Sequence, residues 1–268
     1  MTVKDLLTGS GLEPADAELL LAFTLARPRT WLLAHPEAVV DLGAVTHWSA
    51  LVDRRKRGEP VAYILGEREF HGRNFLVDPH VLIPRPCTER LVDAAIGFVR
   101  DGTLLNETID SGIVCVSAAW RDRESARTIV DVGTGSGCIA VSLARALPDI
   151  RIIATDISAD ALTVAEENAR RHGVGDRIEF RIGKNLDPMK SETQPFLVVS
   201  NPPYIPVGRS LPADVSSFEP SDALFAGQDG MDVLRLLATQ ARSHSACAGI
   251  IVECEEQQKD AFLRLLQT

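Results

Sequence analysis

The chain has 268 residues, of which 45% are hydrophobic and 24% charged, which leaves room for a full hydrophobic core and one or two globular domains. Its 28 Lys and Arg residues against 37 Asp and Glu residues give a formal net charge of −9, which disfavours a stable complex with nucleic acid. No apolar run approaches the length of a membrane span, and the five cysteines lack the spacing of a zinc site or a disulfide framework. We therefore expect a cytoplasmic protein with reduced thiols, no metal site and no association with membranes.

The first part of the chain, up to about residue 60, is expected to form a small bundle of helices. Apolar residues recur at helical spacing over 13–26, where Pro14 suits a first helical turn. The segment 42–52 continues the pattern, and the cations at 54–57 suit the end of a helix. A nucleic-acid contact is the other interpretation of this basic run, but the run is short and isolated, which favours a solvated helix end.

The middle of the chain changes character. Short strands joined by a turn are expected at 61–66 and 70–77, followed by a proline-stiffened loop that leads into a helix beginning near Thr88. Residues 101–126 have mixed polarity and no clear period, so we expect a surface insertion there.

From Thr128 onward, strand and helix signals alternate regularly. Strands are expected at 129–132, 150–156, 177–182, 196–200 and 249–254, and helices at 137–147, 158–172, 232–242 and 257–266. This alternation predicts an α/β fold with a mostly parallel sheet and helices on both faces.

Asn201-Pro202-Pro203-Tyr204 directly follows the strand expected at 196–200, at the sheet edge where open α/β folds bind ligands. The two prolines stiffen the loop and remove two N–H donors, so it is rich in acceptors. The side-chain oxygen of Asn201 and the carbonyls of Asn201 and Pro202 remain, and Tyr204 adds a flat aromatic face. Such a loop suits a planar group with an –NH2, either a carboxamide or an exocyclic base amine, although a simple turn is the plainer interpretation.

A second motif, Asp131-x-Gly133-x-Gly135-x-Gly137, lies between the strand at 129–132 and its helix. Its glycines allow positive φ and close approach of a ligand to the backbone. Asp156, at the end of the next strand, is spaced as a ribose-binding acid is in a dinucleotide fingerprint. The same pattern is typical of S-adenosylmethionine-dependent methyltransferases, whose cofactor carries a sulfonium cation. The acceptor loop at Asn201 favours this second class, because a nicotinamide enzyme has no use for it.

Over most of its length the chain resembles the release-factor glutamine methyltransferases of the HemK/PrmC type. The resemblance is carried by Glu18-Leu-Leu-Leu, Arg29-Thr-Trp-Leu-Leu, 60–70, Ile83-Pro-Arg-Pro86, 131–137, Ser200-Asn-Pro-Pro-Tyr-Ile-Pro206, Phe218-Glu-Pro220, Ala223-Leu-Phe225 and Gly227-x-Asp229-Gly230. It implies a class I S-adenosylmethionine-dependent methyltransferase fold, Rossmann-like, at 76–268, with a small N-terminal helical domain at 1–75 that docks the substrate.

The resemblance also implies the activity and the site. The family methylates the amide nitrogen of the glutamine in the Gly-Gly-Gln motif of peptide-chain release factors, with S-adenosyl-L-methionine as cofactor. The residues expected to bind the cofactor are Asp131, Gly133, Thr134, Gly135, Ser136, Gly137, Asp156, Asn185 and Asn201. The glutamine amide is expected to bind to Asn201, Pro202, Pro203 and Tyr204, with Asn201, Pro202 and Tyr204 as the catalytic residues and Tyr204 packed on the amide plane.

Three departures from the family pattern affect these expectations. Cys87 and Lys184 stand where the family usually has acids. The chain also stops at Thr268, whereas members normally continue into two further strands. We therefore expect an unpaired sheet edge beside 249–254, with low stability or self-association there.

Two alternatives remain open. A DNA adenine-N6 methyltransferase would use the same acceptor loop on a flipped base, but should also bring a basic groove and a target-reading domain. A catalytically impaired binding homologue is the second, suggested by Lys184 and the missing strands.

Overall fold

The computed structural model describes residues 1–102, 108–110, 113–119 and 127–267, which divide into two compact units. The first comprises Met1–Glu67 with Leu211–Phe218, and the second Arg68–Ser210 with Glu219–Thr268. The first unit thus ends before the boundary expected at residue 75, because the hairpin that follows Glu67 belongs to the second unit. No helix in the described ranges is both long enough and apolar enough to cross a membrane.

The N-terminal unit is helical. Its helices are α1 (Val3–Gly9), α2 (Pro14–Leu25), α3 (Arg29–Ala34), α4 (Leu42–Lys56), α5 (Val61–Leu65) and α9 (Ala213–Phe218). Apolar side chains from α1 to α5, among them Leu20, Leu21 and Leu51, form its core. One of the cations at the end of α4 forms an ion pair, in which Arg55 Nε lies 2.7 Å from a carboxylate oxygen of Asp16 on α2.

The strand expected at 61–66 is wrong, because Val61–Leu65 is the short helix α5. Pro60 immediately precedes it, and Gly66 ends it in the left-handed region at φ 74°. A short apolar run between such residues cannot be told from a strand by periodicity alone.

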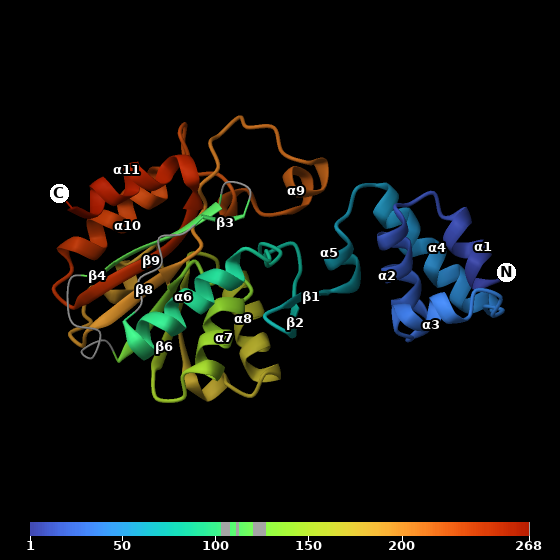
Figure 1. The fold of residues 1–268 in the computed structure, drawn as a ribbon, viewed down its shortest axis with the longest axis horizontal. Helices are drawn as coiled ribbons and strands as arrows, with labels where there is room; N and C mark the ends of the chain where they lie inside the picture. Colours follow the sequence, from blue (N-terminus) through green and yellow to red (C-terminus); the bar gives the residue numbers. More distant parts are fainter. Residues whose placement is uncertain (103–107, 111–112, 120–126, 268) are drawn as a thin grey trace. The chain divides into compact units, whose positions relative to one another are not determined.

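The second unit contains a sheet of seven strands in the order β3-β4-β9-β8-β5-β6-β7 (Figure 1). Their bounds are β3 (Thr108–Asp110), β4 (Ile113–Ala119), β5 (Thr128–Val132), β6 (Arg151–Asp156), β7 (Ile178–Ile182), β8 (Phe196–Ser200) and β9 (Cys247–Glu255). The pairs β9·β8, β8·β5, β5·β6 and β6·β7 are parallel, whereas β3·β4 and β4·β9 are antiparallel. A mostly parallel sheet was predicted and is confirmed.

Helices cover both faces of this sheet (Figure 1). On one face α6 (Thr88–Asp101), α7 (Cys138–Ala146) and α8 (Ala159–Arg171) share a core with Ile129 and Ile152 of the strands. On the other, α10 (Asp232–Ser243) and α11 (Glu256–Gln267) pack on Val130 and Val198. A separate two-stranded hairpin is formed by β1 (Glu67–Phe70) and β2 (Arg73–Leu76).

The prediction of an unpaired sheet edge beside 249–254 is wrong. Strand β4 pairs with β9 along its whole length, from Ile113 opposite Glu255 to Ala119 opposite Gly249. The expected self-association at that edge loses its basis. Part of the stretch expected to be a surface insertion therefore forms the two outer strands β3 and β4, while 103–107, 111–112 and 120–126 lie outside the described residues. Val114 and Val116 face one core and Cys115 the other, so both faces are apolar and the run lacks the alternation that would have revealed it.

Candidate functional site

A cavity of about 590 Å³ lies at the carboxyl ends of β5, β6 and β8 in the second unit. The expected site residues that line it are Gly133, Thr134, Gly135, Ser136, Asp156, Asn185, Asn201, Pro202 and Pro203. Asp131, Gly137 and Tyr204 are not among its lining residues. The two sequence motifs thus meet at one cavity, which three of the expected residues do not line.

The glycine-rich loop shapes the wall that follows β5. Gly133 and Gly135 have positive φ, 71° and 54°, and a Cβ atom built on either would meet nothing within 4 Å. Both therefore present bare backbone to open space, as a close-fitting ligand requires. Gly137 differs, because its Cβ would lie 3.0 Å from the Ala165 side chain on α8. Gly137 thus allows close packing between the loop and α8, and its contact with a cofactor stays a prediction.

Asp131 holds this loop from inside the protein. Its side chain is fully buried, and Oδ2 accepts hydrogen bonds from Thr134 Oγ1 at 2.6 Å and from the Ala140 amide at 3.1 Å. Burial raises the pKa of Asp131 to about 7, although these two hydrogen bonds act in the opposite direction. Asp131 thus braces the loop from inside, and its direct contact with a ligand stays a prediction.

Asp156 ends β6 and faces the cavity. Its Oδ2 accepts a hydrogen bond from the Gly135 amide and its Oδ1 one from the Ser158 amide, both at 2.9 Å. Ser158 caps α8 with its own hydroxyl, which accepts from the Ala161 amide at 3.1 Å. Each carboxylate oxygen of Asp156 has a second lone pair, so the side chain can still accept hydrogen bonds from ligand hydroxyls.

Asn185 follows β7 in a left-handed conformation with φ 49°. Its side-chain Nδ2 is buried and has no hydrogen-bond partner among the described residues. A buried amide donor without a partner costs free energy, and one that borders a cavity is matched by a ligand acceptor. Gly183, two residues earlier, must be glycine, because a Cβ there would lie 2.6 Å from the Pro188 ring.

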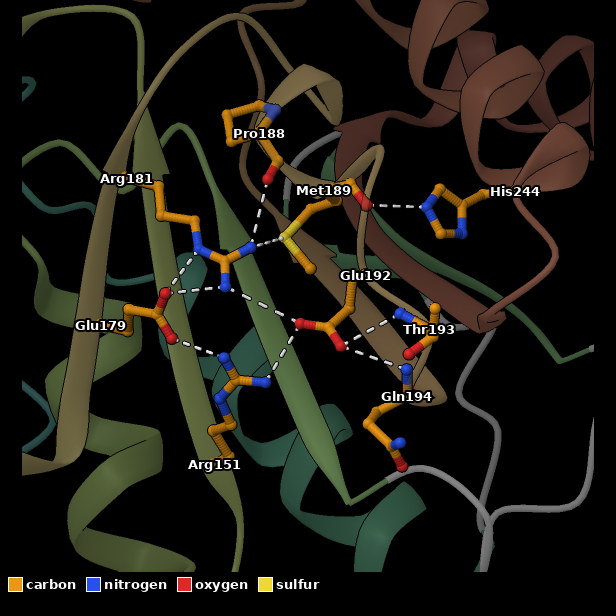
Figure 2. Close-up of polar contacts among 9 residues, drawn as sticks. All are labelled: Arg151, Glu179, Arg181, Pro188, Met189, Glu192, Thr193, Gln194 and His244. Carbon is orange, nitrogen blue, oxygen red and sulfur yellow. Dashed lines mark hydrogen bonds and ion pairs between the residues drawn. The ribbon is translucent and has the colours of Figure 1, made fainter.

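The loop that carries Asn185 is held by an ion-pair cluster that no sequence motif indicated (Figure 2). Its charged members are Arg151, Glu179, Arg181 and Glu192, joined at distances from 2.5 to 3.7 Å. Arg181 also donates to the Pro188 carbonyl at 3.1 Å (Figure 2).

Glu192 closes this cluster against the backbone. Its carboxylate accepts from the Thr193 amide at 3.2 Å and from the Gln194 amide at 3.1 Å. Burial alone would raise the pKa of Glu192, but hydrogen bonds from the Gln194 amide and Arg151 hold it below its usual value. The cluster therefore connects β6 and β7 to the loop that enters the cavity.

The acceptor loop begins where β8 ends. The Ser200 hydroxyl donates to the Val132 carbonyl at 2.6 Å, which joins the ends of β8 and β5. The Asn201 Nδ2 donates to Thr88 Oγ1 at 3.0 Å. Because the –NH2 end is engaged, the Oδ1 end of the Asn201 amide remains as an acceptor. Asn201 and Pro202 line the cavity as expected.

Tyr204 does not lie where we expected it. Its hydroxyl donates to Glu253 Oε1 at 3.0 Å, and its ring packs against the core beneath the loop. Burial and the charge of Glu253 raise the pKa of Tyr204. In this position Tyr204 anchors the loop, and its stacking on an acceptor amide stays a prediction.

Glu219 holds the remaining wall, which runs from Pro79 to Arg85 and from Pro220 to Phe225. Its side chain is only 1% exposed and accepts from the Ile83 amide at 3.1 Å while pairing with Arg85 at 2.5 Å. Glu219 thus joins two loops that are far apart in sequence. Both loops contain motifs that carry the family resemblance, 83–86 and 218–220, but those motifs do not indicate this contact.

The cavity therefore combines a carboxylate, open glycine backbone, an amide donor that has no partner among the described residues, and the acceptor oxygen of Asn201. The first three groups suit a ribose and a polar heterocycle. Among the described residues, no group of three or more His, Cys, Asp and Glu side chains is placed to hold a metal ion.

Two sequence families match the chain. Residues 3–66 match the PrmC N-terminal domain, and residues 101–213 match the Methyltransferase small domain. The release factor glutamine methyltransferase of Bordetella pertussis is 38% identical over 267 residues, which cover 99% of this chain and 90% of that protein. The corresponding protein of Koribacter versatilis is 38% identical over 87% of this chain and 78% of its own length.

Other relatives are more distant or longer. The bifunctional methyltransferase of Rickettsia bellii is 36% identical over 91% of this chain, but the chain spans only 45% of that protein. Among solved structures, the hMettl16 catalytic domain matches with a TM-score of 0.51 over 82% of this chain and 72% of that one, at 15% identity, which supports the fold alone. The identity and coverage of the Bordetella and Koribacter proteins decide the assignment: this chain belongs to the family of release factor glutamine methyltransferases.

Proposed function

We propose that this chain transfers a methyl group from S-adenosyl-L-methionine to the side-chain amide nitrogen of the glutamine in the Gly-Gly-Gln motif of peptide-chain release factors. The observation that carries the proposal is the orientation of Asn201. Its –NH2 end is held by Thr88 at 3.0 Å, so its oxygen is the end offered to an amide in the cavity.

The cofactor side of the proposal rests on three groups that fit S-adenosyl-L-methionine. Asp156 accepts hydrogen bonds from the ribose hydroxyls, and the open backbone at Gly133 and Gly135 lets the cofactor approach closely. Asn185 donates a hydrogen bond to the heterocycle from its Nδ2, which has no partner among the described residues. When bound, the cofactor supplies a methyl group made electrophilic by a sulfonium charge.

The acceptor side addresses the weak nucleophilicity of an amide. The nitrogen lone pair is delocalised into the carbonyl, so the protein must orient the amide and stabilise positive charge on its nitrogen. Asn201 Oδ1 and the Pro202 carbonyl accept hydrogen bonds from the two N–H groups of the glutamine amide and so stabilise this charge. Holding the amide beside the cofactor half of the cavity removes much of the entropic cost of bringing two reactants together. No strong general base is needed, because a protonated amide readily loses its extra proton to water.

The partners follow from the same proposal. Release factors dock through the N-terminal unit, and the enzyme acts in the cytoplasm, where translation terminates. Its net charge of −9 suits a protein substrate better than a stable complex with nucleic acid. DNA adenine-N6 methylation is not favoured, because the curated relatives are release factor glutamine methyltransferases.

The test is incubation with labelled S-adenosyl-L-methionine and three acceptors: an intact release factor, the same factor with its Gly-Gly-Gln glutamine replaced, and adenine-containing duplex DNA. We expect label only in the intact factor, at the glutamine, by mass mapping. Asn201→Ala should remove most of the transfer and leave cofactor affinity nearly unchanged. Label in the DNA, or undiminished label in the glutamine-less factor, would overturn the proposal. An absence of label in every acceptor would favour the impaired homologue.

A further inference from the structure

Asn168, near the end of α8, is a fully buried polar side chain that the proposed mechanism does not use. Its amide group makes three hydrogen bonds, all to the backbone. Its Oδ1 accepts from the Leu76 amide at 2.8 Å, and its Nδ2 donates to the Leu76 carbonyl at 3.0 Å and to the Ser136 carbonyl at 2.8 Å. Because both N–H donors are engaged, Asn168 serves other parts of the chain and not a ligand.

The two backbone partners of Asn168 lead to different parts of the cavity wall. Ser136 belongs to the glycine-rich loop and lines the cavity. Leu76 ends β2, and the chain reaches the cavity soon afterwards, at Pro79, where the wall segment 79–85 begins. Val77, on the short connection, is buried, so this connection is packed against the protein. Asn168 therefore joins the wall segment 79–85 to the glycine-rich loop.

The glycine-rich loop meets α8 at a second point beside Asn168. Ala165 lies three residues before Asn168, so the two side chains share one face of the helix. Gly137 packs directly on Ala165, since a Cβ atom at Gly137 would lie 3.0 Å from the Ala165 side chain. This packing brings the loop close to α8, and the bond from Asn168 then fixes the Ser136 carbonyl toward the protein interior.

An asparagine suits this position for a chemical reason. The three bonds require one acceptor and two donors on a single planar group, which a carboxamide provides. A leucine of similar size would make none of the three bonds, and a carboxyl group would supply at most one of the two donors. The Leu76 amide and the two carbonyls would then lose a partner away from water, which costs free energy.

We propose that Asn168 is a positioning residue for the cofactor, because it holds the glycine-rich loop and the wall segment 79–85 in place before the cofactor binds. A cavity that is already in its bound form does not have to be ordered on binding, so its affinity is higher. The inference rests on the proposed function, since it takes S-adenosyl-L-methionine as the ligand of this cavity. The effect of Asn168 should therefore appear in the affinity for the cofactor.

The experiment compares Asn168→Leu with Val174→Ala, which removes buried apolar contacts just beyond α8 at a residue that does not line the cavity. Both variants should lower the free energy of unfolding. We expect only Asn168→Leu to weaken binding of S-adenosyl-L-methionine, by about tenfold in calorimetric titration. The KM for the cofactor should rise likewise, with kcat at saturating cofactor within about twofold of the parent, because bound cofactor restores the loop.

Two results of this comparison would overturn the inference. One is an affinity of Asn168→Leu within about twofold of the parent. The other is an equal loss of affinity in Val174→Ala, which would show that general destabilisation is the cause. Should Asn168→Leu not fold, Asn168→Asp replaces it, because it keeps the acceptor for the Leu76 amide and loses at least one donated bond. An unchanged affinity in Asn168→Asp would equally overturn the inference.

Hydrogen exchange measures the link without cofactor or methyl transfer. In Asn168→Leu, backbone amides should exchange faster than in the parent over both 133–137 and 76–85, whereas Val174→Ala should leave these two segments unchanged. Unchanged exchange in either segment of Asn168→Leu would refute the link. A parent protein that shows this pattern and binds the cofactor, yet methylates no release factor, would refute the proposed function and leave the inference standing.

Discussion

Two parts of the cavity wall are held in place by different physical means. On the cofactor side, the loop after β7 is secured by the Arg151–Glu179–Arg181–Glu192 cluster (Figure 2), in which Arg151 and Glu179 are 43% and 45% exposed. On the acceptor side, the carboxylates of Glu219 and Glu253 are almost fully buried. Glu219 accepts hydrogen bonds from Ile83 and Arg85 of one loop, and Glu253 from Tyr204 and Cys87 of two loops.

This difference matches what each half must do. Exposed ion pairs are screened by salt and contribute little each, so they hold a loop without fixing each atom. A buried carboxylate without hydrogen-bond partners costs much free energy, so the groups that donate to it are held in fixed positions. A cofactor is bound through many contacts and tolerates small adjustments, whereas an amide nitrogen must be oriented before it can react.

Glu219→Ala should have the largest effect. It leaves the buried Ile83 amide without an acceptor and removes the partner of Arg85. We expect the free energy of unfolding to fall by about 3 kcal/mol, as for other broken buried pairs. Denaturant unfolding measures this, with Glu179→Ala as the matched exposed carboxylate of the ion-pair cluster. Equal losses in the two variants would remove the contrast between the two sides.

Asp156→Ala tests a half-buried carboxylate between these extremes. It should weaken cofactor binding by about 1–3 kcal/mol, through lost hydrogen bonds to the ligand and loss of the bond that holds the Gly135 amide. Calorimetric titration with S-adenosyl-L-methionine measures the affinity for the cofactor, and Asp160→Ala on the exposed side of α8 is the control. An affinity equal to the parent's would exclude Asp156 from the cofactor site.

The buried carboxyl group of Asp131, which holds the glycine-rich loop, should make the stability of the protein depend on pH. Its pKa is raised from 3.8 to about 7, so in that interval the native state holds a proton that the unfolded chain releases. The contribution of Asp131 to stability is therefore full at low pH and is lost as pH rises toward 7, by at most about 1.4 kcal/mol per pH unit. Asp131→Asn should flatten the dependence of unfolding free energy on pH in this window. Parallel curves for parent and variant would show that Asp131 titrates normally.

The exposed cluster should give the smallest effect. Arg151→Ala is expected to lower the free energy of unfolding by less than about 1 kcal/mol, and the loss should shrink further in high salt. Measurements in low and high salt check both statements. A salt-independent loss of several kcal/mol would mean that the cluster behaves like the buried side.

Much of the fold could be predicted because its signals are local. The alternation of strands and helices after Thr128 depends on patterns within single segments, and the structure contains each of those elements. The prediction was wrong where local signals were ambiguous. The run at 61–65 is too short to show a period, and β4 is apolar on both faces.

The site was predictable only in part, for a related reason. The two motifs lie at the ends of neighbouring strands, so their meeting at one cavity follows from the order of the sheet. The bond between Thr88 and Asn201, and that between Tyr204 and Glu253, join segments that only the tertiary structure brings together. A residue such as Tyr204 can then serve the site from behind the wall, which its place in the motif does not reveal.

The position of β9 between β8 and β4 has a consequence for synthesis of the protein. A ribosome produces β4 before β5 and produces β9 after every other strand described here, yet β9 pairs on both sides. Until it emerges, β3 and β4 have no link to the parallel strands, and the inner edge of β8 is open. A nascent chain therefore exposes the apolar edge of β4 until β9 emerges, and from the synthesis of β8 until that point it exposes a second unpaired edge, which chaperones would have to protect.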